Sequence, residues 1–266
     1  MFVPNIAASK VAGLIGLNPY QNKNEIMFDL MMKDPSLKLK LNEIMAVNNR
    51  TSLTKFKREI LEDKDVSAII GTAVRQTTGV ANIKPILDGA ERSARTLLNL
   101  RYSTMDANAR NIIADEVRSA VRCRRGLANE NTGLDQYAAA NDVVVGDRNT
   151  KTFKKSYGAF DLNGRPDGFV MSLNRIVDTK ERTRWSPNVP IYDEVQLRVY
   201  MDLTGAQDSD LNEVFPDGRR RQTNFTNDPA KWQTIVTGLE YAMITMKEII
   251  EEDPDGLRNL VFANSV

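Results

Sequence analysis

The stretch GRPDGFVMSLNRIVDTKER, residues 164–182, has the pattern of a β-hairpin whose turn falls at Leu173-Asn174. A two-residue turn would set Asp167 opposite Lys180. Side chains alternate between the two faces of a strand, so Asp167, Asp178 and Lys180 are predicted to lie together on one face. The hairpin therefore gathers two carboxylates and one ammonium group.

Such a charge cluster predicts a cation site. Two carboxylates this close repel each other unless a cation lies between them, and hard oxygen ligands suit Mg²⁺ or Mn²⁺. The same residues also fit a surface hairpin that carries a chance salt bridge. The hairpin alone leaves both interpretations open, because the pattern is short.

The composition indicates a globular protein. The chain has 266 residues, 41% of them hydrophobic, which is enough for one large domain or two modest ones. No apolar run approaches the roughly 20 residues of a membrane span. The first residues, MFVPNIAAS, lack a secretory pattern, and Cys123 is the only cysteine. We therefore expect an intracellular protein in a reducing compartment, cytoplasm or nucleus, and not a secreted one.

The absence of histidine excludes whole classes of chemistry. Ser-His-Asp hydrolases, Cys-His proteases and ordinary zinc sites all need imidazole or several thiols, and the chain has neither. It also lacks the Gly-x-x-x-x-Gly-Lys-Ser/Thr loop of P-loop ATPases. The net charge of +1 neither favours nor excludes nucleic acid. Chemistry must therefore depend on carboxylates, lysine, hydroxyls or a bound metal.

Pro166-Asp167 followed by Asp178-Thr179-Lys180 resembles the core motif of the PD-(D/E)XK nucleases. Further motifs stand in the order typical of the phage λ exonuclease-like (YqaJ-type) viral recombinases. They are Ala8-Ser9-Lys10, Gly126-x-x-x-Glu130 and Gln196-x-x-x-Tyr200. Each motif alone is short, but the ordered set is specific. The resemblance covers residues 6–20 and about 124–250.

The resemblance implies an α/β fold with a restriction-endonuclease-like core, in which helices flank a mixed central β-sheet. A helical subdomain is inserted into this core. We expect four parts: 1–36, the N-terminal helical part of the core; 37–123, the helical insert; 124–252, the nuclease core; and 253–266, a loosely held C-terminal tail.

Hydrophobic periodicity and capping residues predict the individual elements. Ser9 is the expected N-cap of a short helix that stops at Gly16. The other predicted helices span 24–33, 53–63, 66–75, 83–100, 107–123, 191–203 and 230–252. The other predicted strands lie within 142–148, 153–162, 211–215 and 222–227.

The resemblance also implies roles for the site residues. Asp167, Asp178, Glu130 and the backbone carbonyl of Thr179 would hold one or two Mg²⁺ ions, with Mn²⁺ as a substitute. Lys180 would position or deprotonate the attacking water and stabilise developing negative charge. Gln196 would orient Lys180 or that water.

Five residues are expected to contact DNA phosphates: Ser9, Lys10, Arg125, Arg165 and Tyr200. In the resembled recombinases the serine of the first motif helps to hold a terminal phosphate. Arg118, Arg122 and Arg125 share one helix face. That face is either solvated or in contact with a DNA backbone, since arginine forks fit phosphate.

The expected function is metal-dependent hydrolysis of DNA, and the resemblance favours a 5′→3′ exonuclease on duplex ends in viral-type recombination or genome processing. One alternative is a structure-specific or sequence-specific endonuclease. Another is a non-catalytic DNA-binding protein that retains the fold. DNA is the expected partner, and no membrane is. A single-strand annealing protein is the usual companion of the resembled family, and self-association stays open.

Overall fold

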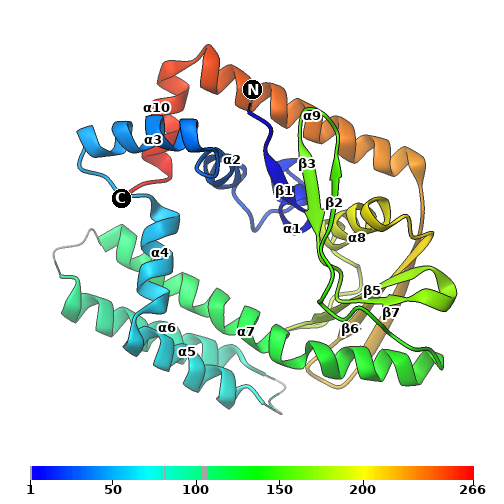
Figure 1. The fold of residues 1–266 in the computed structure, drawn as a ribbon. Helices are drawn as coiled ribbons and strands as arrows, with labels where there is room; N and C mark the ends of the chain where they lie inside the picture. Colours follow the sequence, from blue (N-terminus) through cyan, green and yellow to red (C-terminus); the bar gives the residue numbers. More distant parts are fainter. Residues whose placement is uncertain (1, 79, 81, 104–106) are drawn as a thin grey trace.

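The strands form two sheets in the computed structural model, which describes residues 2–78, 80, 82–103 and 107–266 (Figure 1). The smaller sheet has the order β1-β3-β2, with β1 parallel to β3 and β2 antiparallel to it. The larger has the order β4-β5-β6-β7, in which only β5 and β6 run parallel. The strands are β1 (Asn5–Ala7), β2 (Phe153–Ser156), β3 (Asp161–Gly164), β4 (Gly168–Val170), β5 (Arg175–Glu181), β6 (Asp208–Val214) and β7 (Arg220–Thr226). The chain is therefore mixed α/β, as predicted.

The hairpin of β4 and β5 exists, but its predicted register is wrong. Four residues, Met171–Asn174, join the strands, and Asn174 adopts a left-handed conformation with φ of 47°. Val170 pairs with Arg175 and Gly168 with Val177, a shift of two residues from the prediction. Because the direction of the side chains alternates with a period of two residues, this shift leaves each side chain on its predicted face.

The arm before the turn is also shorter than predicted. Gly164 ends β3 in the smaller sheet, and Arg165 to Asp167 carry the chain across to the larger one. The predicted strand at 142–148 is absent. Asp142, Asp147 and Asn149 all have positive φ and bend this backbone, so only Gly146 makes a bridge, to Phe169.

Ser9 does not cap the first helix. Helix α1 (Ala8–Leu14) begins directly after β1, and its N-cap position is Ala7, which makes no side-chain capping bond. The pairing of β1 with β3 sets the point at which the chain turns into the helix. Gly16, with φ of 79°, follows the end of the helix.

The larger hydrophobic cluster joins the helices around the two sheets. These helices are α1, α2 (Lys23–Met31), α3 (Pro35–Val47), α8 (Ile191–Thr204), α9 (Pro229–Glu251) and α10 (Pro254–Ala263). The expected loose tail is wrong, because α10 buries Leu257, Leu260 and Val261. Backbone hydrogen bonds between Thr51 and Val266 also fix the last residue.

A second hydrophobic cluster belongs to the helices of the predicted insert. It involves α4 (Leu53–Glu62), α5 (Lys64–Gln76), α6 (Lys84–Arg101) and the first half of α7 (Ala107–Asn141). Helix α3 packs in the larger cluster instead. Helix α7 continues well past its predicted end at Cys123 and reaches the larger sheet (Figure 1). One continuous helix thus links the helical part to the core.

Helices α7 and α8 cover opposite faces of the larger sheet. Val177 of β5 packs with Leu134 and Tyr137 of α7, whereas Ile176 packs in the larger cluster with Val199 of α8. Alternation along β5 therefore places Asp178 and Lys180 on the α8 side and Thr179 on the α7 side. Among the residues that the structure describes, no helix is long and apolar enough to cross a membrane.

Candidate active site

Asp178 and Lys180 form an ion pair on β5. The distance from Lys180 Nζ to Asp178 Oδ2 is 2.7 Å. Asp178 is only 1% exposed, whereas the Lys180 side chain is 27% exposed. Burial lowers the pKa of Lys180, but the charges of Asp178 and Asp167 outweigh it and raise that pKa above its ordinary value. Lys180 therefore stays protonated, and its ammonium group is still accessible to solvent.

Asp167 joins this pair from the connection between the two sheets. Its Oδ2 accepts a hydrogen bond of 2.8 Å from the backbone N–H of Thr179. Burial, and then the charge of Asp178, raises the pKa of Asp167 to about 9. The structure thus brings together the three residues that the hairpin pattern predicts, despite the changed register.

Glu130 approaches the same place from α7. Its charge contributes to the raised pKa of Asp167, after the larger effects of burial and Asp178. A hydrogen bond from Asn149 Nδ2 engages Glu130 Oε1, and the backbone N–H of Asn149 donates to the carbonyl of Asp167 at 3.1 Å. No sequence pattern indicates Asn149, because its place depends on how segment 142–149 folds.

A glycine in a helix can let a neighbouring element approach closely, but no element does so at Gly126. A Cβ atom there would meet no heavy atom within 4 Å. Gly133 takes that role instead, since a Cβ on it would collide with the side chain of Thr179. The amide of Asn212 also donates to the carbonyl of Gly133 at 3.1 Å. Helix α7 therefore meets β5 two turns later than the motif implies.

Gln196 and Tyr200 form one unit on α8. Gln196 Nε2 donates to the Tyr200 hydroxyl at 2.7 Å. Burial, and then the charge of Asp178, raises the pKa of Tyr200 above its usual range. The Tyr200 ring packs so closely on Gly164 that a Cβ there would lie 2.7 Å from the ring. Tyr200 is therefore buried beside the carboxylates and does not face solvent, contrary to a phosphate-contact role.

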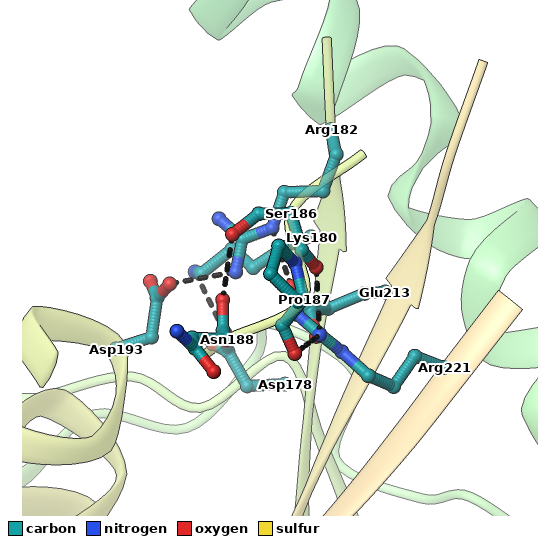
Figure 2. A network of polar contacts seen from close by, with 9 residues as sticks. All are labelled: Asp178, Lys180, Arg182, Ser186, Pro187, Asn188, Asp193, Glu213 and Arg221. Atoms are coloured by element: carbon teal, nitrogen blue, oxygen red, sulfur yellow. Dashed lines mark hydrogen bonds and ion pairs between the residues drawn. The ribbon is translucent and has the colours of Figure 1, made fainter. Parts of the chain in front are cut away.

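A polar network continues from the site through Arg182 (Figure 2). Arg182 Nη2 lies 2.6 Å from Asp193 Oδ2 on α8, and its Nε lies 2.7 Å from Glu213 Oε1 on β6. Arg221 of β7 contacts Glu213 and donates to the carbonyl oxygens of Ser186 and Pro187. The network fastens the loop after β5 to the sheet. Alternation from Lys180 could have indicated Arg182, but nothing in the sequence pairs it with Glu213.

The residues expected to contact phosphates differ in their surroundings. Lys10 lines a separate cavity with Asp29 and Thr54. Ser9 and Arg165 are exposed, and Arg125 is buried against Glu181 with 2.5 Å between Nη2 and Oε1. Of these residues, Arg125 is the one whose ion-pair partner lies on β5, next to Lys180.

The donor set fits a hard divalent cation at Asp167 and Asp178. Asp178 Oδ1 is buried and has no hydrogen-bond partner among the described residues, which is costly for a carboxylate oxygen. A cation would satisfy this oxygen and offset the repulsion that raises the pKa of Asp167. Within the described residues, no group of three or more His, Cys, Asp or Glu side chains is arranged to hold a metal. A third carboxylate would therefore require Glu130 to leave Asn149.

Comparison with known proteins gives structural relatives only. No protein-family model and no curated protein matches the chain. An alkaline exonuclease from Laribacter hongkongensis is 16% identical, with a TM-score of 0.43, covering 71% of this chain and 93% of that one. A second structure of that exonuclease, in complex with dAMP, is 16% identical, with a TM-score of 0.40 and coverage of 59% and 88%.

A phage related exonuclease from Haemophilus somnus 129PT is 14% identical, with a TM-score of 0.41, covering 62% of this chain and 84% of that one. The chain is thus distantly similar in structure to an alkaline exonuclease and to a phage related exonuclease. The resemblance is distant, so the function proposed below depends on the site's own residues.

Proposed function

We propose that this protein is a metal-dependent nuclease that hydrolyses phosphodiester bonds of DNA. The observation that carries the proposal is the buried Asp178–Lys180 pair beside Asp167, with one carboxylate oxygen left without a donor. Well-packed apolar residues would stabilise the sheet at least as well as such a charge cluster does. A reaction that needs both a bound cation and an ammonium group explains why these charges lie together.

Asp167, Asp178 and the backbone carbonyl of Thr179 would hold Mg²⁺ or Mn²⁺, with Glu130 joining once Asn149 releases it. A cation bound there would make a nearby water more acidic and offset the charge that develops on the phosphate. The proposed ligands come from a strand, from the connection between the sheets and from α7.

Lys180 would bind a phosphate oxygen or the attacking water. Its pKa lies above the ordinary value, so it remains an ammonium group at neutral pH. It would therefore donate hydrogen bonds and stabilise negative charge, and would not accept the proton of the water. Gln196 would keep the Tyr200 hydroxyl in place, and Tyr200 in turn packs beside Asp178.

The ordered motifs favour a 5′→3′ exonuclease on duplex ends that acts in recombination. An endonuclease would use the same chemistry on another substrate, and a covalently closed circle separates the two. The other alternative is a non-catalytic DNA-binding protein. The hydrogen bond from Asn149 to Glu130 favours it, because this bond engages a carboxylate that is proposed to bind the metal.

The test is release of nucleotides from a linear duplex with a 5′-phosphate, in Mg²⁺ and then in EDTA. Lys180→Ala should reduce release by at least about a hundredfold, the scale of a lost electrostatic stabiliser. Lys154→Ala, which removes an exposed lysine on β2, should leave the rate unchanged. Circular dichroism checks that both variants fold.

The outcomes separate the proposals. Metal-dependent release that only Lys180→Ala abolishes supports the nuclease, and the end that is lost gives the polarity. Cutting of a closed circle favours the endonuclease. Binding of DNA with no cleavage of either substrate would contradict the nuclease and leave the non-catalytic protein.

A further inference from the structure

A groove separates the helices of the insert from the core at the end of β5. Its volume is about 960 Å³. Lys84 of α6 and Arg122 of α7 line one side, while Tyr192 of α8 and the loop after β5 line the other. In the view of Figure 1, α6 and α7 run below α1 and α8. Glu181 and Arg182, which also line the groove, directly follow Lys180 in the chain.

The groove presents positive charge. Its two lining carboxylates are neutralised from within the protein, since Glu181 pairs with Arg125, and Glu213 pairs with Arg182 and Arg221. The cationic side chains that line it are Lys84, Arg118, Arg122, Arg182 and Arg184.

Two of these cations are available to a ligand. Lys84 pairs with Asp88, and Arg118 pairs with Asp88 and Glu91. Arg122 and Arg184 are exposed and have no ion pair within the described part of the chain. They lie on opposite sides of the groove, one on the insert and one on the core, so both could contact phosphates of a strand that runs between them.

An aromatic side chain completes the surface. Tyr20 lines the groove and is 75% exposed. Its ring meets the ring of Tyr192 edge-on, with 6.0 Å between the centroids and an interplanar angle of 83°. An exposed ring held by a second ring offers its face to a flat partner. Cations that track a backbone together with an aromatic face are typical of sites for unpaired nucleic acid, since a paired base cannot leave its stack to reach the ring.

We propose that this groove binds an unpaired nucleic-acid strand beside the Asp178–Lys180 site, and that the helical insert supplies one of its walls. The inference rests on the proposed nuclease function in one respect, that the strand in the groove is the one that reaches Lys180. It gives the insert a role in substrate binding that the core motifs do not contain.

Fluorescence anisotropy in EDTA tests the proposal without hydrolysis, with a labelled oligothymidine and a labelled duplex as probes. Arg122→Ala combined with Arg184→Ala should weaken oligothymidine binding about tenfold or more at low salt. It should also reduce the slope of log affinity against log salt by about 1.4, or about 0.7 for each lost phosphate contact. Arg124→Ala is the matched control, since Arg124 is exposed on α7 and does not line the groove.

The tyrosine is tested in the same assay. Tyr20→Ala should weaken oligothymidine binding about tenfold, leave the salt slope unchanged and affect the duplex little, because one base would lose its stacking partner. Tyr20→Phe should restore the affinity. Tyr241→Ala removes another exposed tyrosine, on α9 outside the groove, and should bind as wild type.

Affinity that is unchanged by Tyr20→Ala, or lowered as much by Arg124→Ala as by the double arginine variant, would overturn the groove proposal. Nucleotide release in Mg²⁺ is measured on the same preparations. A protein that binds oligothymidine through the groove yet releases no nucleotide overturns the nuclease alone. A protein that releases nucleotides while its groove variants bind as wild type overturns the groove alone.

Discussion

Asp167 is a proposed metal ligand whose position lowers the stability of the metal-free protein. Its carboxylate is largely buried beside Asp178 and accepts a hydrogen bond from the backbone N–H of Thr179. Burial and charge repulsion disfavour the ionised form, so the metal-free protein holds a proton on Asp167 that the unfolded chain releases. Without a bound cation, the cluster is therefore predicted to lower the free energy of unfolding.

Asp167→Asn should show this in the metal-free protein. The pKa of Asp167 is raised from 3.8 to about 9, so its contribution to stability is complete below about pH 4 and is lost as the pH rises through 9. In EDTA the wild type should lose up to about 1.4 kcal/mol of unfolding free energy per pH unit in this range, relative to Asp167→Asn. Urea unfolding of both proteins at pH 5 and pH 8 measures the difference.

At pH 8 Asp167→Asn should therefore be the more stable protein without metal, and it should lose nucleotide release in Mg²⁺. A stability difference that is the same at both pH values would contradict the assigned environment of Asp167.

Helix α7 depends on its two glycines in opposite ways. Gly126 belongs to the recognised motif, yet space around it is open, whereas Gly133 contacts the side chain of Thr179. The spacing of residues along α7 cannot distinguish them, because only the approach of β5 makes one of them crowded.

Gly126→Ala and Gly133→Ala form a matched pair on this helix. Gly126→Ala should stabilise the protein by about 0.5–1 kcal/mol, since alanine is the better helix former. Gly133→Ala should destabilise it by about 1 kcal/mol or more, because the added methyl collides with Thr179 and overpacking exceeds the gain in helix propensity. Urea unfolding of the two variants checks the prediction, which fails if their effects have the same sign.

On the scale of the whole molecule, the last residues hold the segment around Thr51 in place. Residue Val266 pairs with Thr51 through two backbone hydrogen bonds, and Arg50 donates to the carbonyl oxygens of Phe262 and Ser265. Helix α10 buries three apolar side chains against the larger cluster. The segment is thus a structural part of the core.

Deletion of residues 254–266 should lower the stability by several kcal/mol, at about 1.5–3 kcal/mol for each of the three buried side chains of α10. Arg50→Ala should lower it by only about 1–3 kcal/mol, because it removes hydrogen bonds to carbonyl oxygens and leaves the apolar contacts. Thermal unfolding compares both with the wild type. If the deletion does not change the melting temperature, the structural role of α10 is contradicted and segment 253–266 is loosely held.

The sequence by itself determined the charged face of β5, the helices α4, α6, α8 and α9 within a few residues, and the class of the fold. The helices and the charged face follow from local periodicity, whereas the class of the fold follows from the resemblance of the ordered motifs. The face of Asp167, Asp178 and Lys180 is kept after a two-residue register shift because side-chain direction has a period of two residues.

Only the tertiary structure decided the division into two sheets, the length of α7, the place of Asn149 and Gly133, and the burial of Arg125 and Tyr200. Each of these depends on which distant segment packs against the residue. The sequence presents Arg118, Arg122 and Arg125 as one helix face, but the acidic partners that neutralise Arg118 and Arg125 come from α6 and β5. Among the residues that the structure describes, packing thus leaves Arg122 as the cation of this face that is free to bind a ligand.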